Sequence, residues 1–107
     1  MEKIEKLRNY LQDSPDDPFL KHALALEYIK AGEDGKAREL FIDILTLDPD
    51  YVGSYYHLAA LLERTGDREA AISWYEKGMA AAKRQGDQHA FNELRSSPSF
   101  RSAALAA

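Results

Sequence analysis

Residues 64–75, RTGDREAAISWY, decide the fold of this chain, because residues 30–41, KAGEDGKARELF, repeat their pattern 34 positions upstream. A glycine, an alanine and an aromatic residue occupy the same places in both stretches. In each stretch the glycine ends a run of helical spacing, and an acidic residue close behind it precedes the next run. The two stretches therefore predict a corner between two helices that is built twice.

A shift of 34 residues matches residues 15–48 to residues 49–82 at six identical positions. These pairs are Pro15/Pro49, Asp16/Asp50, Leu24/Leu58, Ala25/Ala59, Gly32/Gly66 and Ala37/Ala71. The residue types suit a helix–turn–helix unit, because alanines let two helices approach closely, glycine accepts a positive φ, and proline stops a helix. Such a unit cannot bury its apolar face alone, so neighbouring units are expected to stack.

Apolar residues recur at helical spacing along the rest of the chain, whereas valine occurs once and no run alternates as a strand would. We expect helices over residues 2–12, 18–31, 35–47, 51–65 and 68–84, then a short helix within 87–95. Aspartates in the turns are expected to cap three of these helices, at Asp17, Asp34 and Asp67. The predicted fold class is all-α.

This repeat resembles the tetratricopeptide repeat (TPR), which has the same 34-residue period. The first unit supplies Leu24, Ala25, Tyr28, Gly32, Ala37, Phe41 and Pro49, and the second supplies Tyr55, Leu58, Ala59, Leu62, Gly66, Asp67, Ala71, Tyr75 and Gly78. Three positions depart from the family pattern: Lys21 replaces an aromatic residue, Ile44 a small residue and Lys83 a proline. Because no proline stops it, the last helix of the second unit is expected to run to about Gln85.

The resemblance implies an α-solenoid of stacked antiparallel helical hairpins that coils into a right-handed superhelix. It implies one TPR-like domain over residues 1–95 and a C-terminal tail over 96–107, which is expected to be flexible or to dock on a neighbouring copy. The segments of the domain are a half-unit helix at 1–14, repeat 1 at 17–48, repeat 2 at 50–85 and a capping helix at 87–95.

In the TPR family, the first helices of successive hairpins line a concave groove that holds a partner peptide. The equivalent positions here are Phe19, His22, Leu26, Ile29 and Lys30 in the first unit and Gly53, Tyr56, Ala60, Glu63 and Arg64 in the second. Some members clamp the C-terminal carboxylate of chaperone tails with Lys and Asn on the first groove helix. His22 and Leu26 stand at those positions in this chain, so we do not expect that clamp.

No pattern in the chain predicts catalysis, a cofactor or a metal. The turn at Gly66 lacks the GxxxxGK[ST] pattern of a phosphate loop, and no cysteine or GxSxG motif offers a nucleophile. His22 and His57 have no His, Asp or Glu four positions later, and His89 with Glu93 is typical of a pair on a helix surface. We expect a protein that is not an enzyme.

The composition bears on two classes of partner, nucleic acids and membranes, and on the cellular compartment. A net charge of −4 and a pI of about 5.3 argue against a nucleic-acid partner. No run of about 18 apolar residues is present, so no membrane span is expected. The absence of cysteine fits a reducing compartment, and we expect a cytoplasmic protein.

Two functions remain open at this point. The first is a non-catalytic interaction module or scaffold that binds a peptide or partner protein in the groove. The second is a structural protein that self-associates into a homo-oligomer, because about three repeats are usually needed for stability. In that case Phe91, Leu94 or the tail would dock on a second copy. A third idea is that the last residues, ALAA at 104–107, resemble a bacterial degradation tag.

Overall fold

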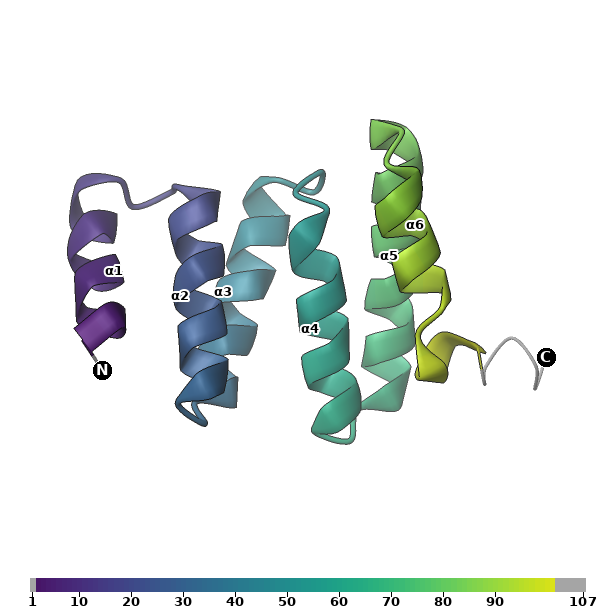
Figure 1. Cartoon of the computed structure of the whole chain (residues 1–107), viewed down its shortest axis with the longest axis horizontal. Helices are drawn as coiled ribbons and strands as arrows, with labels where there is room; N and C mark the ends of the chain where they lie inside the picture. The colour runs from purple at the N-terminus through teal and green to yellow at the C-terminus, as the bar shows by residue number, and fades with distance from the viewer. Residues whose placement is uncertain (1, 102–107) are drawn as a thin grey trace. The chain divides into compact units, whose positions relative to one another are not determined.

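The computed structural model describes residues 2–101, and within them every regular element is helical (Figure 1). The helices are α1 (Glu2–Asp13), α2 (Pro18–Lys30), α3 (Asp34–Leu47), α4 (Gly53–Arg64), α5 (Arg68–Gln85) and α6 (Gln88–Arg95). Residues 98–101 are helical as well. No strand occurs among the described residues, and the all-α fold class is confirmed. The degradation-tag motif at 104–107 lies outside the described residues.

The chain forms two compact units, Met1–Asp48 and Pro49–Ala107. In the first unit α1 packs against α2, and α2 packs against α3. In the second unit α4 packs against α5, and α6 packs against both. Each unit therefore holds one helical hairpin, α2–α3 or α4–α5, which is the element that the repeat predicts.

The turns at Gly32 and Gly66 have the same structure, as their shared sequence predicts. Both glycines adopt a left-handed conformation, with φ values of 78° and 95°. The residue after each glycine donates its backbone N–H to a carbonyl in the last turn of the preceding helix, from Glu33 to Tyr28 at 2.8 Å and from Asp67 to Leu62 at 2.9 Å. A residue with a Cβ atom would be strained at either position, so glycine is required to end these helices.

Two of the three predicted caps are confirmed. Asp17 accepts hydrogen bonds from two backbone N–H groups in the first turn of α2, at 2.9 and 3.2 Å, and Asp67 accepts one from α5 at 3.2 Å. The prediction for Asp34 is wrong, because α3 begins at Asp34 itself. Glu33 is the N-cap residue there, and its side chain makes no capping hydrogen bond.

The residues that the repeat assigns to packing are buried in both units. The four alanines, Ala25, Ala37, Ala59 and Ala71, are fully buried. The paired larger residues Leu24, Leu58, Phe41 and Tyr75 are buried as well. Helix α5 ends at Gln85, as predicted from the lysine that replaces proline at position 83. Gly86 then closes α5 in a left-handed conformation.

Lys21 takes the place of an aromatic residue in the first unit and is nevertheless buried. Its stem packs in the hairpin while its ammonium group lies 3.9 Å from the carboxylate of the exposed Asp16. Tyr55 holds the equivalent position in the second unit, where its hydroxyl donates to the Pro49 carbonyl at 2.6 Å. Lys21 fills its site less completely than a tyrosine would, because a cleft of about 250 Å³ lies beside it, lined by Asp16, Pro18, Lys21, Ile44, Leu47 and Asp48.

Candidate functional site

The five predicted groove residues of the first unit lie along one side of α2, and we call this row the α2 stripe. Residues three or four positions apart share one face of a helix, which is why the five form a row. Phe19 leaves 69% of its surface exposed at the start of the row, and Lys30 is exposed at its end. Between them lie three half-buried residues, His22, Leu26 and Ile29. The buried residues on the other side of α2 are Lys21, Leu24, Ala25 and Tyr28.

Contacts within the first unit hold the two polar residues of the α2 stripe. The His22 ring meets the buried Phe41 ring edge-on, with centroids 5.6 Å apart and planes at 68°. Lys30 donates to the carboxylate of Glu27 at 3.1 Å. The buried Phe41 ring therefore supports the His22 ring from below the α2 stripe. At the end of the stripe, the charge of Lys30 is paired with that of Glu27.

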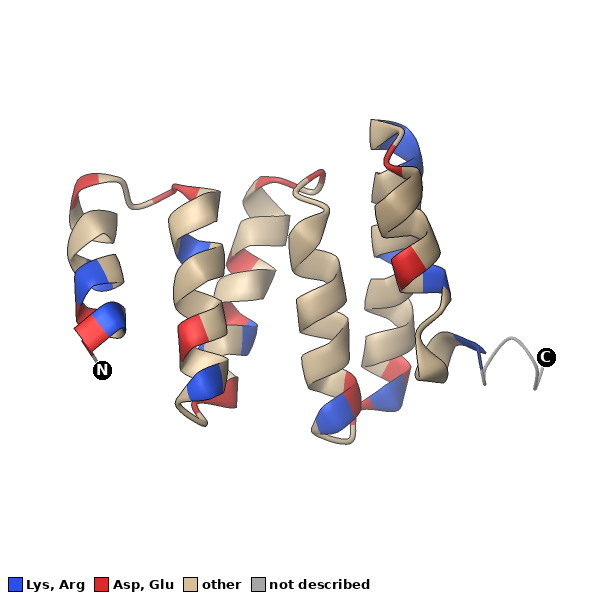
Figure 2. Cartoon of the chain, in the orientation of Figure 1, with Lys and Arg blue, Asp and Glu red and all other residues tan. Residues whose placement is uncertain are grey.

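The other five predicted residues form an equivalent row on α4, the α4 stripe. Gly53 and Arg64 are exposed at its two ends, and the half-buried Tyr56, Ala60 and Glu63 lie between them. Charged residues on α4 occur only at its C-terminal end, at Glu63 and Arg64 (Figure 2). The α4 stripe is thus uncharged for most of its length and ends in one acidic and one basic side chain.

Tyr56 is held in the α4 stripe by two neighbouring rings. Its ring lies 5.7 Å from that of His57 and 6.3 Å from that of Tyr75, both edge-on. Burial lowers the pKa of His57, and the nearby Glu93 carboxylate partly opposes this effect. Tyr56 therefore presents at the surface a ring whose orientation is supported by two neighbouring rings.

Glu63 is engaged by the chain itself, which the sequence did not predict. The Tyr75 hydroxyl donates to Glu63 Oε1 at 3.0 Å, and the backbone N–H of Ser99 donates to Oε2 at 2.9 Å. The Ser99 hydroxyl makes a second hydrogen bond to Oε2. Burial raises the pKa of Tyr75, and the hydrogen bond to the Glu63 carboxylate raises it further, so this phenol stays a donor at neutral pH.

One signal in the sequence points to the segment that contacts Glu63. Ser97 precedes Pro98, and a serine followed by a proline is typical of a helix start. In the structure the Ser97 hydroxyl accepts the Phe100 backbone N–H at 3.3 Å, as a cap does. The signal predicts the helical turn at 98–101 and leaves its contact with Glu63 undetermined, because Ser99 and Glu63 lie 36 positions apart in the sequence.

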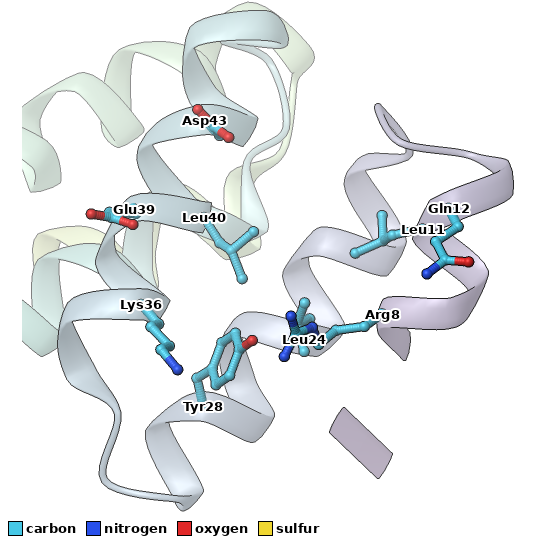
Figure 3. Close-up of a pocket in the computed structure, with 9 residues that line it drawn as sticks. All are labelled: Arg8, Leu11, Gln12, Leu24, Tyr28, Lys36, Glu39, Leu40 and Asp43. Atoms are coloured by element: carbon cyan, nitrogen blue, oxygen red, sulfur yellow. The ribbon is translucent and has the colours of Figure 1, made fainter. Parts of the chain in front are cut away.

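A further cleft of about 500 Å³ lies in the first unit, away from the predicted residues. Figure 3 shows Leu11 of α1 and Leu40 of α3 pointing toward each other, with Leu24 and Tyr28 of α2 between these helices. The other residues that line it are Arg8, Gln12, Lys36, Glu39 and Asp43. The cleft combines an apolar base with charges of both signs.

The described part of the chain offers neither a metal site nor a membrane span. Residues 2–101 contain no group of three or more His, Cys, Asp or Glu side chains that could hold a metal ion. None of the helices in that range has the length and apolar character needed to cross a membrane.

A match to a known protein family agrees with the helical hairpins, the 34-residue period and the glycine turns. The model of the tetratricopeptide repeat matches residues 1–81. The chain belongs to the tetratricopeptide repeat family. It is also 30% identical over 91 residues to a TPR repeat-containing protein of Pseudomonas aeruginosa, and the match covers 85% of this chain and 87% of that protein.

Solved structures of TPR proteins are similar to this chain along most of its length. A tetratricopeptide repeat domain protein from Salinibacter ruber shares 42% identity with a TM-score of 0.70, covering 74% of this chain and 88% of the other. The first TPR of Spaghetti (RPAP3), bound to an HSP90 peptide, shares 23% identity with a TM-score of 0.73, covering 97% and 78% respectively. At that identity the second likeness concerns the fold alone.

Leu94 on α6 belongs to the core of the second unit. It is 1% exposed, and its Cδ1 atom packs against Gly78 in the same unit. The prediction that Leu94 docks on a second copy is therefore wrong, because its surface is already covered within its own unit. Phe91 is half-buried, with the charged groups of Lys83 and Arg95 5.9 and 5.8 Å from the centre of its ring.

Proposed function

We propose that this chain is a non-catalytic protein–protein interaction module, and that the α2 stripe and the α4 stripe are the faces that contact a peptide or partner protein. The observation that carries the proposal is the exposure of Phe19, which leaves 69% of its surface uncovered beside the apolar row of the α2 stripe. Large aromatic side chains are costly to leave in water and often anchor interfaces. The absence of cysteine supports a cytoplasmic location as part of this proposal.

The α4 stripe supports the same proposal with a second aromatic residue. Tyr56 is half-buried and fixed by two rings, so little side-chain entropy would be lost when a partner covers it. Between Gly53 and Glu63 the stripe has no charge that binding would have to desolvate. These features favour a partner segment that presents apolar side chains.

The family supports a peptide as the partner, but this chain lacks the residues of the carboxylate clamp that some members use. The first TPR of Spaghetti has been solved with an HSP90 peptide bound. In this chain His22 and Leu26 stand where the resemblance implies Lys and Asn for a carboxylate clamp. We therefore propose recognition through apolar contacts along the stripes, with the charges at Lys30 and Arg64 at their ends.

The proposal is tested by affinity capture with quantitative mass spectrometry. The test variant combines Phe19→Ser with Tyr56→Ala, which removes one aromatic anchor from each stripe. Tyr10→Ser is the matched control, because Tyr10 is an aromatic residue with 58% of its surface exposed and lies on α1, outside both stripes. Proteins that the wild type and the control capture, and the test variant loses, support the proposal. Capture of the same proteins by all three would overturn it.

Self-association remains the alternative, and it predicts a different result. A homo-oligomer would sediment as a dimer or larger species at micromolar concentration and would capture chiefly its own chain. A monomer that captures other proteins through the stripes excludes this alternative. One sedimentation measurement, made in parallel with the capture experiment, therefore distinguishes the two functions.

A further inference from the structure

We propose that residues 97–101, which we call the C-terminal latch, occupy the Glu63 end of the α4 stripe and compete with a partner for that carboxylate. The inference rests on the proposed function of the α4 stripe. It adds that the chain carries its own occupant for one end of this face. The competing partner is a peptide that presents a serine or threonine in the manner of Ser99.

The hydrogen bonds of Glu63 show why the latch and a partner would exclude each other. Oε1 accepts from the Tyr75 hydroxyl at 3.0 Å, and Oε2 accepts both the backbone N–H and the hydroxyl of Ser99. Two of these three donors belong to the latch. A partner that hydrogen-bonds Oε2 must therefore take the place of Ser99.

The latch is arranged so that one side faces the hairpin and the other faces water. Ser97 and Ser99 are 4% and 6% exposed, whereas Pro98 and Arg101 are exposed. The Ser97 hydroxyl caps the short helical turn by accepting the Phe100 backbone N–H at 3.3 Å. Ser97 thus shapes the turn, and Ser99 contacts the Glu63 carboxylate.

The contact between the latch and the hairpin depends largely on hydrogen bonds. Its two buried side chains are serines, and its one aromatic residue, Phe100, is only half-buried. A peptide of similar chemistry can replace such hydrogen bonds one for one, because a backbone N–H and a hydroxyl are available from any serine or threonine. The same exchange would be far harder for a segment held by a large apolar core.

The closeness of Ser99 to Glu63 also provides a way to open the latch by mutation. A carboxylate at position 99 would face the carboxylate of Glu63, and like charges at hydrogen-bond distance repel each other. Ser99→Asp should therefore release residues 97–101 and leave the α4–α5 hairpin intact. The substitution changes only the latch and leaves every residue of the α4 stripe in place.

The first experiment measures the latch without any partner. Amide hydrogen exchange by NMR on the full chain should show the Ser99 N–H protected, and Glu63→Gln should reduce that protection at least threefold. Glu93→Gln is the matched control, because Glu93 is an acidic residue of the same unit that pairs with the exposed His89 and lies outside the latch. A Ser99 N–H that exchanges equally fast in wild type and Glu63→Gln would overturn the proposal.

The second experiment adds the acetylated, amidated peptide SSPSFR, which copies residues 96–101, to the full chain. By NMR titration, Ser99→Asp should bind this probe at least tenfold more tightly than wild type does, with shifts at Tyr56, Glu63 and Tyr75. Adding Glu63→Gln to Ser99→Asp should remove the gain. Equal binding by wild type and Ser99→Asp, or binding by neither, would overturn the proposal.

The two experiments separate failure of the latch from failure of the proposed function. Both use only this chain and its own peptide, so they give a result whatever the cellular partner is. If the latch is confirmed and the stripe variants still capture the same proteins as wild type, the proposed function fails while the latch stands as a self-contact. If capture depends on the stripes and Ser99 is unprotected, the latch fails alone.

Discussion

Gly78 on α5 lies so close to Tyr55 on α4 that a Cβ atom at Gly78 would stand 2.6 Å from the Cβ atom of Tyr55. The same added atom would lie 3.0 Å from Cδ1 of Leu94 on α6. Neither Cβ atom can move without its backbone, so α4 and α5 would have to separate. Gly78 therefore allows α4 and α5 to approach closely at this point of the second hairpin.

The first prediction is that Gly78→Ala destabilises the protein, because overpacking a core usually costs about 1–3 kcal/mol. This cost should exceed the gain of up to about 1 kcal/mol that alanine brings to a helix interior. Urea unfolding followed by circular dichroism measures the difference. Gly35→Ala is the control, because nothing lies within 4 Å of its added Cβ in α3. It should stabilise the protein, and equal effects of both changes would contradict this account.

The second prediction concerns Lys21, which stands where the second unit has Tyr55. Lys21→Tyr should stabilise the protein by about 0.5–2 kcal/mol, a common gain when a cavity is filled. The ring would occupy the cleft of about 250 Å³ beside Lys21, and its hydroxyl could reach the Pro15 carbonyl as that of Tyr55 reaches Pro49. Thermal unfolding should show a higher Tm for Lys21→Tyr and a lower Tm for Lys21→Ala. A lower Tm for both would show that the cleft cannot accept a ring.

The sequence predicts interactions between residues that are close together along the chain, and it does not predict those between distant residues. The ends of the helices at Gly32 and Gly66 and the caps at Asp17 and Asp67 depend on residues within one turn, so the sequence predicts them. The half-buried surface of the stripes follows from helical periodicity. The Ser99–Glu63 contact joins residues 36 positions apart, and no local pattern specifies it. The misplaced cap at Asp34 has a local cause, because two acidic residues follow Gly32 and either could precede the helix.

The third prediction compares two residues that the repeat makes equivalent, Asp67 and Glu33. Asp67→Ala should cost about 1 kcal/mol, because it removes the carboxylate that caps α5. Glu33→Ala should change the free energy of unfolding by only a few tenths of a kcal/mol. Its side chain makes no capping bond, and its pair with Lys36 at 4.0 Å is exposed and therefore weak. Urea unfolding of the two variants at the same pH provides the measurement, and equal losses would contradict the assignment of the caps.

The fourth prediction starts from the lowered pKa of His57, whose burial penalises the charged imidazolium. In the unfolded chain this pKa returns to about 6.5, so just below neutral pH the unfolded state binds more protons than the folded state. Stability then rises with pH across this window and is lost as the pH falls through 6.5 toward the folded pKa. The Glu93 carboxylate reduces the effect, because it favours the charged ring.

Replacing His57 with glutamine should therefore flatten the dependence of stability on pH. Between pH 7.5 and 5.5, the wild type should lose more of its free energy of unfolding than His57→Gln does, as measured by urea unfolding at each pH. The carboxylates titrate in both proteins, so the difference between the two curves isolates the histidine. His89→Gln is the control, because it makes the same substitution at a histidine on α6 whose side chain is 93% exposed. A wild type and a His57→Gln variant with parallel curves would show that His57 ionises equally in both states.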